Sequence, residues 1–264
     1  MKKFLVFVCL AAMMISAIIP FSASAESDGV VFSVNEKYTT TSAINDVPLT
    51  FEAIINVPVN ADRAGVVIGN YNKSDVSYNM EIYTGGVPRF YAYYSSSKKV
   101  DIKFSDVNVN TAEDLHLTIT IDTANGKAYC YVNGELKQTV SKAVTETVSL
   151  NPYMIGGDLR ADNDQYFKGS IKYAATYSDL RTADEVKADV NGADTNDADL
   201  LFAYDLTAVG DNKLKDLSKN KNDLVVDSPL KNVGELGGYV SNIENRYFVN
   251  KAFANIPLTC EAVV

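Results

Sequence analysis

The chain has 264 residues, a formal net charge of −9, three cysteines and no tryptophan. This length is sufficient for one large domain with a well-buried core. The acidic charge disfavours nucleic acid and anionic membranes as partners, because binding to phosphate requires clustered lysine and arginine. Since His116 is the only histidine, histidine-based zinc and di-metal hydrolase sites are excluded from this chain.

Residues 1–25 have the features of a secretory leader. Lys2 and Lys3 form a positive start, an apolar stretch follows over residues 4–19, and residues 23–25 read Ala-Ser-Ala, a small-residue cleavage site. The sequence therefore predicts a secreted protein with no membrane anchor after cleavage. Only Cys130 and Cys260 would remain, which is too few for a disulfide framework.

The next residues read as β-strands. We expect strands over residues 30–34, 48–57 and 64–71, the last of them a continuous apolar run typical of a buried strand. Glu52 falls inside the second strand, and we expect it at a solvent-facing position.

Residues 77–95 predict a hairpin turning at Gly85 and Gly86. With a three-residue loop over residues 85–87, Ile82 would face Phe90 and the apolar side chains would share one face. The opposite face would carry six residues suited to binding a sugar, with rings for pyranose C–H faces and polar groups for hydroxyls. They are Asn79, Glu81, Tyr83, Arg89, Tyr91 and Tyr93. The alternative is an ordinary exposed sheet in which tyrosines pair across strands.

The stretch from residue 115 to residue 140 is the clearest β-pattern in the chain. Apolar and polar residues alternate, and the pairs Asn125-Gly126 and Asn133-Gly134 supply turn signals, so three antiparallel strands are expected. Cys130 falls on the apolar face as a small buried residue. Three such strands need a second sheet to cover that face, which predicts an antiparallel β-sandwich.

Two features follow the central strands. The polar loop over residues 157–164 contains Asp158, Asp162 and Asp164, and oxygen ligands on a loop suit Ca²⁺, although a solvated turn is the alternative. Further on, Thr182 and Glu185 have the spacing of a capping box, which predicts a short helix ending near residue 191.

Four motifs follow one another from the central strands to the predicted helix: DTANGKAYCYVNGEL starting at Asp122, MIGGD at Met154, FKGSI at Phe167 and YSDLRTADEV at Tyr177. Together they resemble the laminin-G-like modules of the concanavalin A-like lectin/glucanase superfamily. The resemblance covers about residues 30–235 and implies a two-sheet antiparallel jelly-roll sandwich with one short helix.

The chain then starts to repeat itself. The segment PLTFEAII at Pro48 is similar to PLTCEAVV at Pro257, and VNEKY at Val34 is similar to IENRY at Ile243. A repeat of this length indicates tandem domains. We therefore expect a leader over residues 1–25, a laminin-G-like domain over 27–235, and the start of a second copy over 236–264, as in a fragment of a longer protein.

The resemblance implies a non-catalytic module, directed at a glycan or cell surface, in a secreted multidomain protein of the bacterial type. No nucleophile is placed near His116, and no strand carries the paired carboxylates of a glycosidase. Two alternatives stay open. The chain could be the accessory region of a secreted hydrolase, such as a glycoside hydrolase or metallophosphoesterase, or a structural adhesin or spacer repeat.

Overall fold

The structure is a computed structural model that describes residues 29–32, 37–44, 46–160, 165–207, 213–225, 238–241 and 246–249. The predicted leader lies outside the described residues, as do most of the predicted second copy and the two carboxylates Asp162 and Asp164. The described chain consists of strands, one α-helix and one 3-10 turn.

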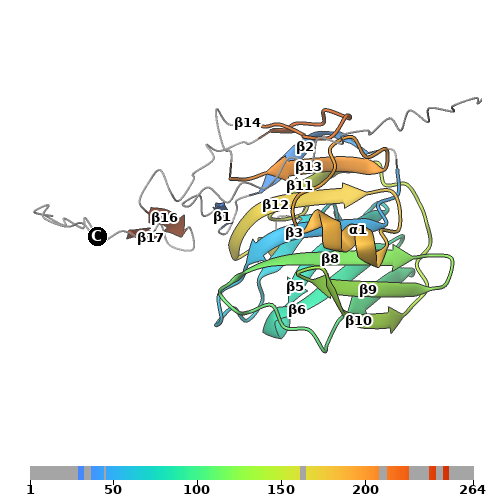
Figure 1. Ribbon diagram of the computed structural model, residues 1–264, viewed down its shortest axis with the longest axis horizontal. Helices are drawn as coiled ribbons and strands as arrows, with labels where there is room; N and C mark the ends of the chain where they lie inside the picture. Colours follow the sequence, from blue (N-terminus) through green and yellow to red (C-terminus); the bar gives the residue numbers. More distant parts are fainter. Residues whose placement is uncertain are drawn as a thin grey trace, which may run out of the picture.

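Two antiparallel sheets form the two layers of a sandwich (Figure 1). The first, here called the front sheet, has seven strands, in which β13 pairs with β12 beside the main order. In spatial order they are β1 (Val30–Phe32), β12 (Gly169–Tyr177), β3 (Thr50–Asn56), β8 (Asp114–Asp122), β9 (Lys127–Val132) and β10 (Glu135–Ser141), with β13 (Leu200–Asp205) next to β12.

The second sheet, here called the back sheet, has eight strands. In spatial order they are β14 (Lys213–Leu214), β15 (Leu224–Val225), β2 (Tyr38–Ala43), β11 (Pro152–Ile155), β4 (Gly65–Gly69), β5 (Ser77–Tyr83), β6 (Val87–Tyr93) and β7 (Lys99–Lys103). A separate two-stranded hairpin is formed by β16 (Gly238–Ser241) and β17 (Arg246–Val249).

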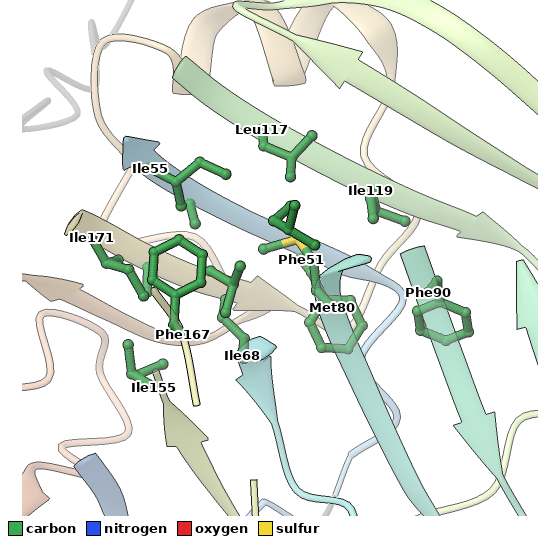
Figure 2. Packing of buried hydrophobic residues seen from close by; sticks show 14 of the residues in the cluster. Phe51, Ile55, Ile68, Met80, Phe90, Leu117, Ile119, Ile155, Phe167 and Ile171 are labelled. Atoms are coloured by element: carbon green, nitrogen blue, oxygen red, sulfur yellow. The ribbon is translucent and has the colours of Figure 1, made fainter. Parts of the chain in front are cut away.

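The core lies between the two sheets, where alternate residues of each strand interdigitate (Figure 2). Phe51 and Leu117 come from the front sheet, and Ile68, Met80 and Phe90 come from the back sheet; all five are fully buried. Cys130 is buried in the same core, as predicted, and is a free thiol. The predicted jelly-roll sandwich is thus confirmed.

Helix α1 (Ala183–Asp189) lies against the outer face of the front sheet (Figure 1). The predicted capping box is present: the Thr182 hydroxyl accepts from the Glu185 backbone N–H at 3.3 Å, and the Glu185 carboxylate accepts from the Thr182 backbone N–H at 2.7 Å. The helix is tied to the strands by Arg181, whose guanidinium donates to the Asp189 carboxylate and whose backbone N–H donates to the Thr50 hydroxyl of β3 at 3.2 Å.

The position of helix α1 on the front sheet explains why the expectation for Glu52 is wrong. Its side chain was predicted to face solvent, but Glu52 is 0% exposed and His116, on the neighbouring strand β8, is 4% exposed. The Thr50 hydroxyl on the same strand donates to the backbone oxygen of Asp179 at 2.8 Å, in the segment that leads to α1. Sequence alternation assigns a residue to the outer face of a sheet, but it does not reveal that a helix covers that face.

The β5–β6 hairpin also differs from the prediction in its register. The loop is the 3-10 turn η1 (Thr84–Gly86), so Ile82 pairs with Pro88 and Met80 with Phe90 instead of Ile82 with Phe90. Gly85 and Gly86 have φ values of 75° and 74°, which glycine adopts without strain. Because the shift is two residues, every side chain stays on its predicted face.

Candidate functional site

The outer face of the back sheet carries a cluster of arginine, tyrosine and carboxylate side chains. On β5 and β6, Met80 and Phe90 point into the core, whereas Asn79 pairs with Tyr91 and Glu81 with Arg89 on the other side. All six predicted residues share this face. We call the complete cluster the arginine–tyrosine face; it comprises Arg63, Tyr71, Asn79, Glu81, Tyr83, Arg89, Tyr91, Tyr93, Asp158, Arg160 and Gln165.

Glu81 lies between two guanidinium groups. Although only 1% exposed, its carboxylate accepts from Arg89 and also contacts Arg63 Nη2 at 3.4 Å. Arg89 donates from Nε and from Nη2 to the two oxygens of Asp101 on β7, both at 2.7 Å. Burial would lower the pKa of Arg89, but the hydrogen bonds to Asp101 and the charge of Glu81 offset this and raise it. Glu81 therefore holds the arginines in place from beneath.

A second buried carboxylate, Asp158, holds the third arginine. The Asn79 amide donates to Asp158 Oδ2 at 2.9 Å, and Arg160 Nε lies 3.0 Å from each oxygen of the same carboxylate. No larger residue fits at the adjacent Gly69, because a Cβ there would lie 2.2 Å from the Asn79 amide oxygen. Asn79 is 0% exposed, so it supports Asp158 from below.

Each tyrosine ring on this face has a cation over it. Arg160 lies 4.5 Å from the Tyr71 ring centroid, and Arg89 lies 4.7 Å from that of Tyr91 and 5.0 Å from that of Tyr83. Tyr71 contacts Tyr91 edge-on at a centroid distance of 5.5 Å. The pKa of the Tyr91 hydroxyl is raised to about 12, mainly by burial and secondly by the neighbouring Tyr71. This hydroxyl therefore stays neutral and can donate a hydrogen bond. The rings are fixed both by their neighbours and by cation–π contacts.

Four members of the face were not predicted. Arg63 precedes β4 and Tyr71 follows it, while Arg160 and Gln165 come after β11, far along the chain. The strand order brings β4 and β11 together beside β5. A residue pattern within one hairpin contains no information about such partners. The available signals were that Arg63 directly precedes the expected strand 64–71 and that Arg160 lies in the expected polar loop 157–164.

The predicted calcium ligands are only partly described. Asp158 is buried, and both of its oxygens already accept hydrogen bonds, from Arg160 and from Asn79. A cation at this carboxylate would have to displace a guanidinium, so Asp158 does not fit the role of a Ca²⁺ ligand in this arrangement. Over the described ranges, no group of three or more His, Cys, Asp and Glu residues is placed to hold a metal. The calcium site stays a prediction for the loop that contains Asp162 and Asp164.

A second polar cluster lies under helix α1. His116 Nε2 is 3.8 Å from Glu52 Oε2, and Thr118 donates to Glu52 Oε1 at 3.4 Å. Burial lowers the pKa of His116 to about 4, and burial together with the charge of Asp189 raises the pKa of Glu52 well above its ordinary value. These groups are covered by the helix and the segment before it, so they form part of the packing and not a surface for a ligand.

The chain belongs to the concanavalin A-like lectin/glucanases superfamily, since a laminin G family model of that description matches residues 27–187, more than half of the chain. The match confirms the resemblance drawn from the sequence motifs. Comparison with curated proteins gives no significant match. Among the described residues, no helix has the length and apolar character needed to cross a membrane.

Solved structures share this fold at low sequence identity. A candidate carbohydrate binding protein from Bacteroides ovatus is 18% identical with a TM-score of 0.54; the match covers 78% of this chain and 61% of that one. A heptameric SAP-like pentraxin from Limulus polyphemus is 11% identical with a TM-score of 0.51, over 77% of this chain and 96% of the pentraxin. The present chain thus spans less than two thirds of the Bacteroides protein. Likeness at this identity establishes the fold alone.

Proposed function

We propose that this protein is a non-catalytic glycan-binding module of a secreted multidomain protein. The observation that carries the proposal is the arginine–tyrosine face, a set of hydrogen-bonding and aromatic groups held in fixed positions on the outer face of the back sheet. Part of the outer face of the front sheet, in contrast, is covered by α1 and the segment before it. The leader pattern of residues 1–25 supports secretion, and the Bacteroides ovatus protein with the same fold is itself a candidate carbohydrate binder.

The chemistry of the face fits a polyhydroxylated ligand. Arginine donors and tyrosine hydroxyls can make directional hydrogen bonds to sugar hydroxyls, and their positions are fixed before a ligand arrives. Glu81 bonds to Arg89, Arg89 bonds also to Asp101, and Asp158 bonds to Arg160 and Asn79, so these groups use most of their hydrogen-bonding capacity within the protein and keep the surface rigid. Because a site on the outer face of a sheet excludes little water, we expect weak affinity for a single saccharide.

The proposal is tested by removing one ring of the face. Tyr91→Ala should cost about 1–2 kcal/mol of saccharide binding free energy, because the tyrosine hydroxyl and the ring that supports Arg89 are both lost. Tyr129→Ala, a half-buried tyrosine on β9 of the front sheet, is the matched control and should leave binding unchanged. A glycan array followed by titration calorimetry measures both variants. Equal binding by the wild type and Tyr91→Ala would remove this face from consideration, and binding to no glycan at all would favour the spacer alternative.

We further propose that the module does not hydrolyse glycans or phosphoesters. Glu81 is the central carboxylate of the face, and its two oxygens are occupied by Arg63 and Arg89. With both oxygens engaged by guanidinium groups, this carboxylate is not placed to reach a leaving group or an anomeric carbon, as the carboxylates of a glycosidase must be. Incubation with oligosaccharides and with nitrophenyl phosphoesters should show no turnover above buffer. Turnover that disappears in Glu81→Gln would show that the face is catalytic.

A further inference from the structure

We propose that the arginine–tyrosine face selects an acidic saccharide, a sugar that carries a carboxylate, and that this carboxylate displaces the Gln165 amide oxygen from between Arg63 and Arg160. The inference rests on the proposed glycan-binding function and specifies the chemical class of its ligand. It is carried by the local charge, by the unequal hydrogen bonding of the three arginines and by the position of Gln165 between two of them.

The local charge of this face has the opposite sign to that of the whole chain. The formal net charge of the chain is −9, yet the face and the adjoining strand β7 contain five cations and three carboxylates. The lysines of β7 belong to this surface, since Lys103 pairs with Arg89 and Lys99 with Tyr93. Two of the three carboxylates, Glu81 and Asp158, are buried, so the accessible groups are mainly cations: Arg63, Arg89, Arg160, Lys99 and Lys103. Such a surface attracts an anion and concentrates it near the face.

The three arginines differ in how completely they are bonded. Arg89 donates from Nε, Nη1 and Nη2 to two carboxylates, and Arg160 donates from Nε and Nη2 to Asp158. Arg63 contacts Glu81 at 3.4 Å and Gln165 at 3.1 Å through Nη2, while its buried Nε has no acceptor among the described residues. Its side chain is also the most exposed of the three, at 23% against 14% for each of the others. Arg63 is therefore the guanidinium of the three that keeps an unused donor and has the greatest exposure to a ligand.

Gln165 marks the position that an anionic oxygen would take. Its Oε1 accepts from Nη2 of Arg63 and from Nη2 of Arg160, so one neutral oxygen is shared by two positive groups. A carboxylate oxygen in this position would make charge-assisted hydrogen bonds, which are roughly twice as strong as neutral ones. A planar carboxylate also matches the planar fork of a guanidinium better than an isolated hydroxyl does.

The aromatic rings lead to the same conclusion. Tyr83 has three cations near its ring, with Lys103 at 4.2 Å and both Arg89 and Arg63 within 5.2 Å of the centroid. Tyr71 and Tyr91 each have an arginine over the ring. Ring faces covered by cations are poorly available for stacking on the C–H face of a neutral pyranose. The face would therefore recognise a saccharide through its charge and through hydrogen bonds to its hydroxyl groups, and less through ring stacking.

The test compares acidic saccharides with neutral ones of the same skeleton. Trigalacturonic acid is compared with its methyl ester, and sialyllactose with lactose, by titration calorimetry at two salt concentrations. We expect an acidic member to bind about tenfold tighter than its neutral counterpart or better, since a hydrogen bond to a charged group contributes at least as much as this factor. The preference should shrink as salt is added. Arg63→Gln should remove it, whereas Lys172→Gln on the front sheet, which also removes one positive charge, should not.

A second variant supplies a carboxylate from the protein itself, between the two arginines. In Gln165→Glu a carboxylate would fill the position between Arg63 and Arg160, so the melting temperature should rise at pH 7 and the preference for acidic saccharides should disappear. The two proposals fail in different ways. If neutral and acidic saccharides bind equally and Tyr91→Ala weakens both, glycan binding stands and the acidic preference is wrong. If no saccharide of either pair binds, the acidic preference is wrong, and glycan binding is wrong as well only if the glycan array shows no ligand. An acidic preference that survives Arg63→Gln and Gln165→Glu would place the site elsewhere.

Discussion

At the residue scale, the buried pair of Glu52 and His116 has the clearest energetic consequence. Burial disfavours the charged form of both side chains, since it raises the pKa of Glu52 well above its ordinary value and lowers that of His116 to about 4. The two effects have opposite signs. Glu52 contributes stability at low pH that is lost as the pH rises from its unfolded pKa towards its folded one. His116 contributes stability above its unfolded pKa that is lost as the pH falls towards about 4.

We predict that Glu52→Gln stabilises the protein at alkaline pH relative to acidic pH. The glutamine side chain has nearly the same shape as that of glutamate and can donate an amide N–H towards His116, but it does not ionise. The gain over the wild type should be small at pH 5 and increase towards pH 8, by up to about 1.4 kcal/mol per pH unit between the two pKa values. Urea denaturation across this pH range measures it, with the exposed Glu113→Gln as control. A gain that is the same at all pH values would contradict a raised pKa of Glu52 in the folded protein.

At the element scale, alternation predicted which face each residue of β5 and β6 occupies, and this is why all six predicted residues share one surface. The pairing was wrong by two residues because the turn begins at Thr84, one residue earlier than expected. Strands β2 and β7 were not predicted, since β2 is mostly threonine and serine and β7 has only two buried residues. Partners from other elements, above all Arg63 and Arg160, depend on strand order, which no local pattern contains.

The helix α1 gives a prediction at this scale. Thr182→Ala removes the hydroxyl that accepts from the Glu185 backbone N–H, and the protein should lose about 1 kcal/mol of unfolding free energy. Thr182→Ser retains the hydroxyl and should restore nearly all of it. The loss should appear as a lower urea midpoint with an unchanged slope. If alanine and serine behaved alike, the capping box would not contribute to stability.

At the scale of the whole molecule, the two sheets are assembled from strands between residues 30 and 225, whereas β16 and β17 pair with each other as a separate sheet. A two-stranded hairpin is marginally stable by itself in water. The proposed domain boundary near residue 235 rests on this division and on the repeat of the sequence after it.

We therefore predict that deletion of residues 236–264 leaves the sandwich folded, with an unfolding free energy within about 0.5 kcal/mol of the longer chain. A second deletion, from residue 208 onwards, removes β14 and β15 as well. It should destabilise the domain, because Leu224 and Val225 pair with β2 and the side chains of Leu214 and Leu224 are buried in the core. Calorimetry of the three proteins measures this. Loss of a cooperative transition in the shorter deletion would place the boundary elsewhere.

The cations over the rings have an optical consequence. The chain has 16 tyrosines and no tryptophan, so tyrosine emission is not masked by the stronger indole fluorophore. Tyr71, Tyr83 and Tyr91 each have a guanidinium close to the ring, and any ligand that draws Arg63, Arg89 or Arg160 away changes the electronic surroundings of these chromophores. Near-ultraviolet circular dichroism and intrinsic fluorescence can thus report on occupancy of the site without a label.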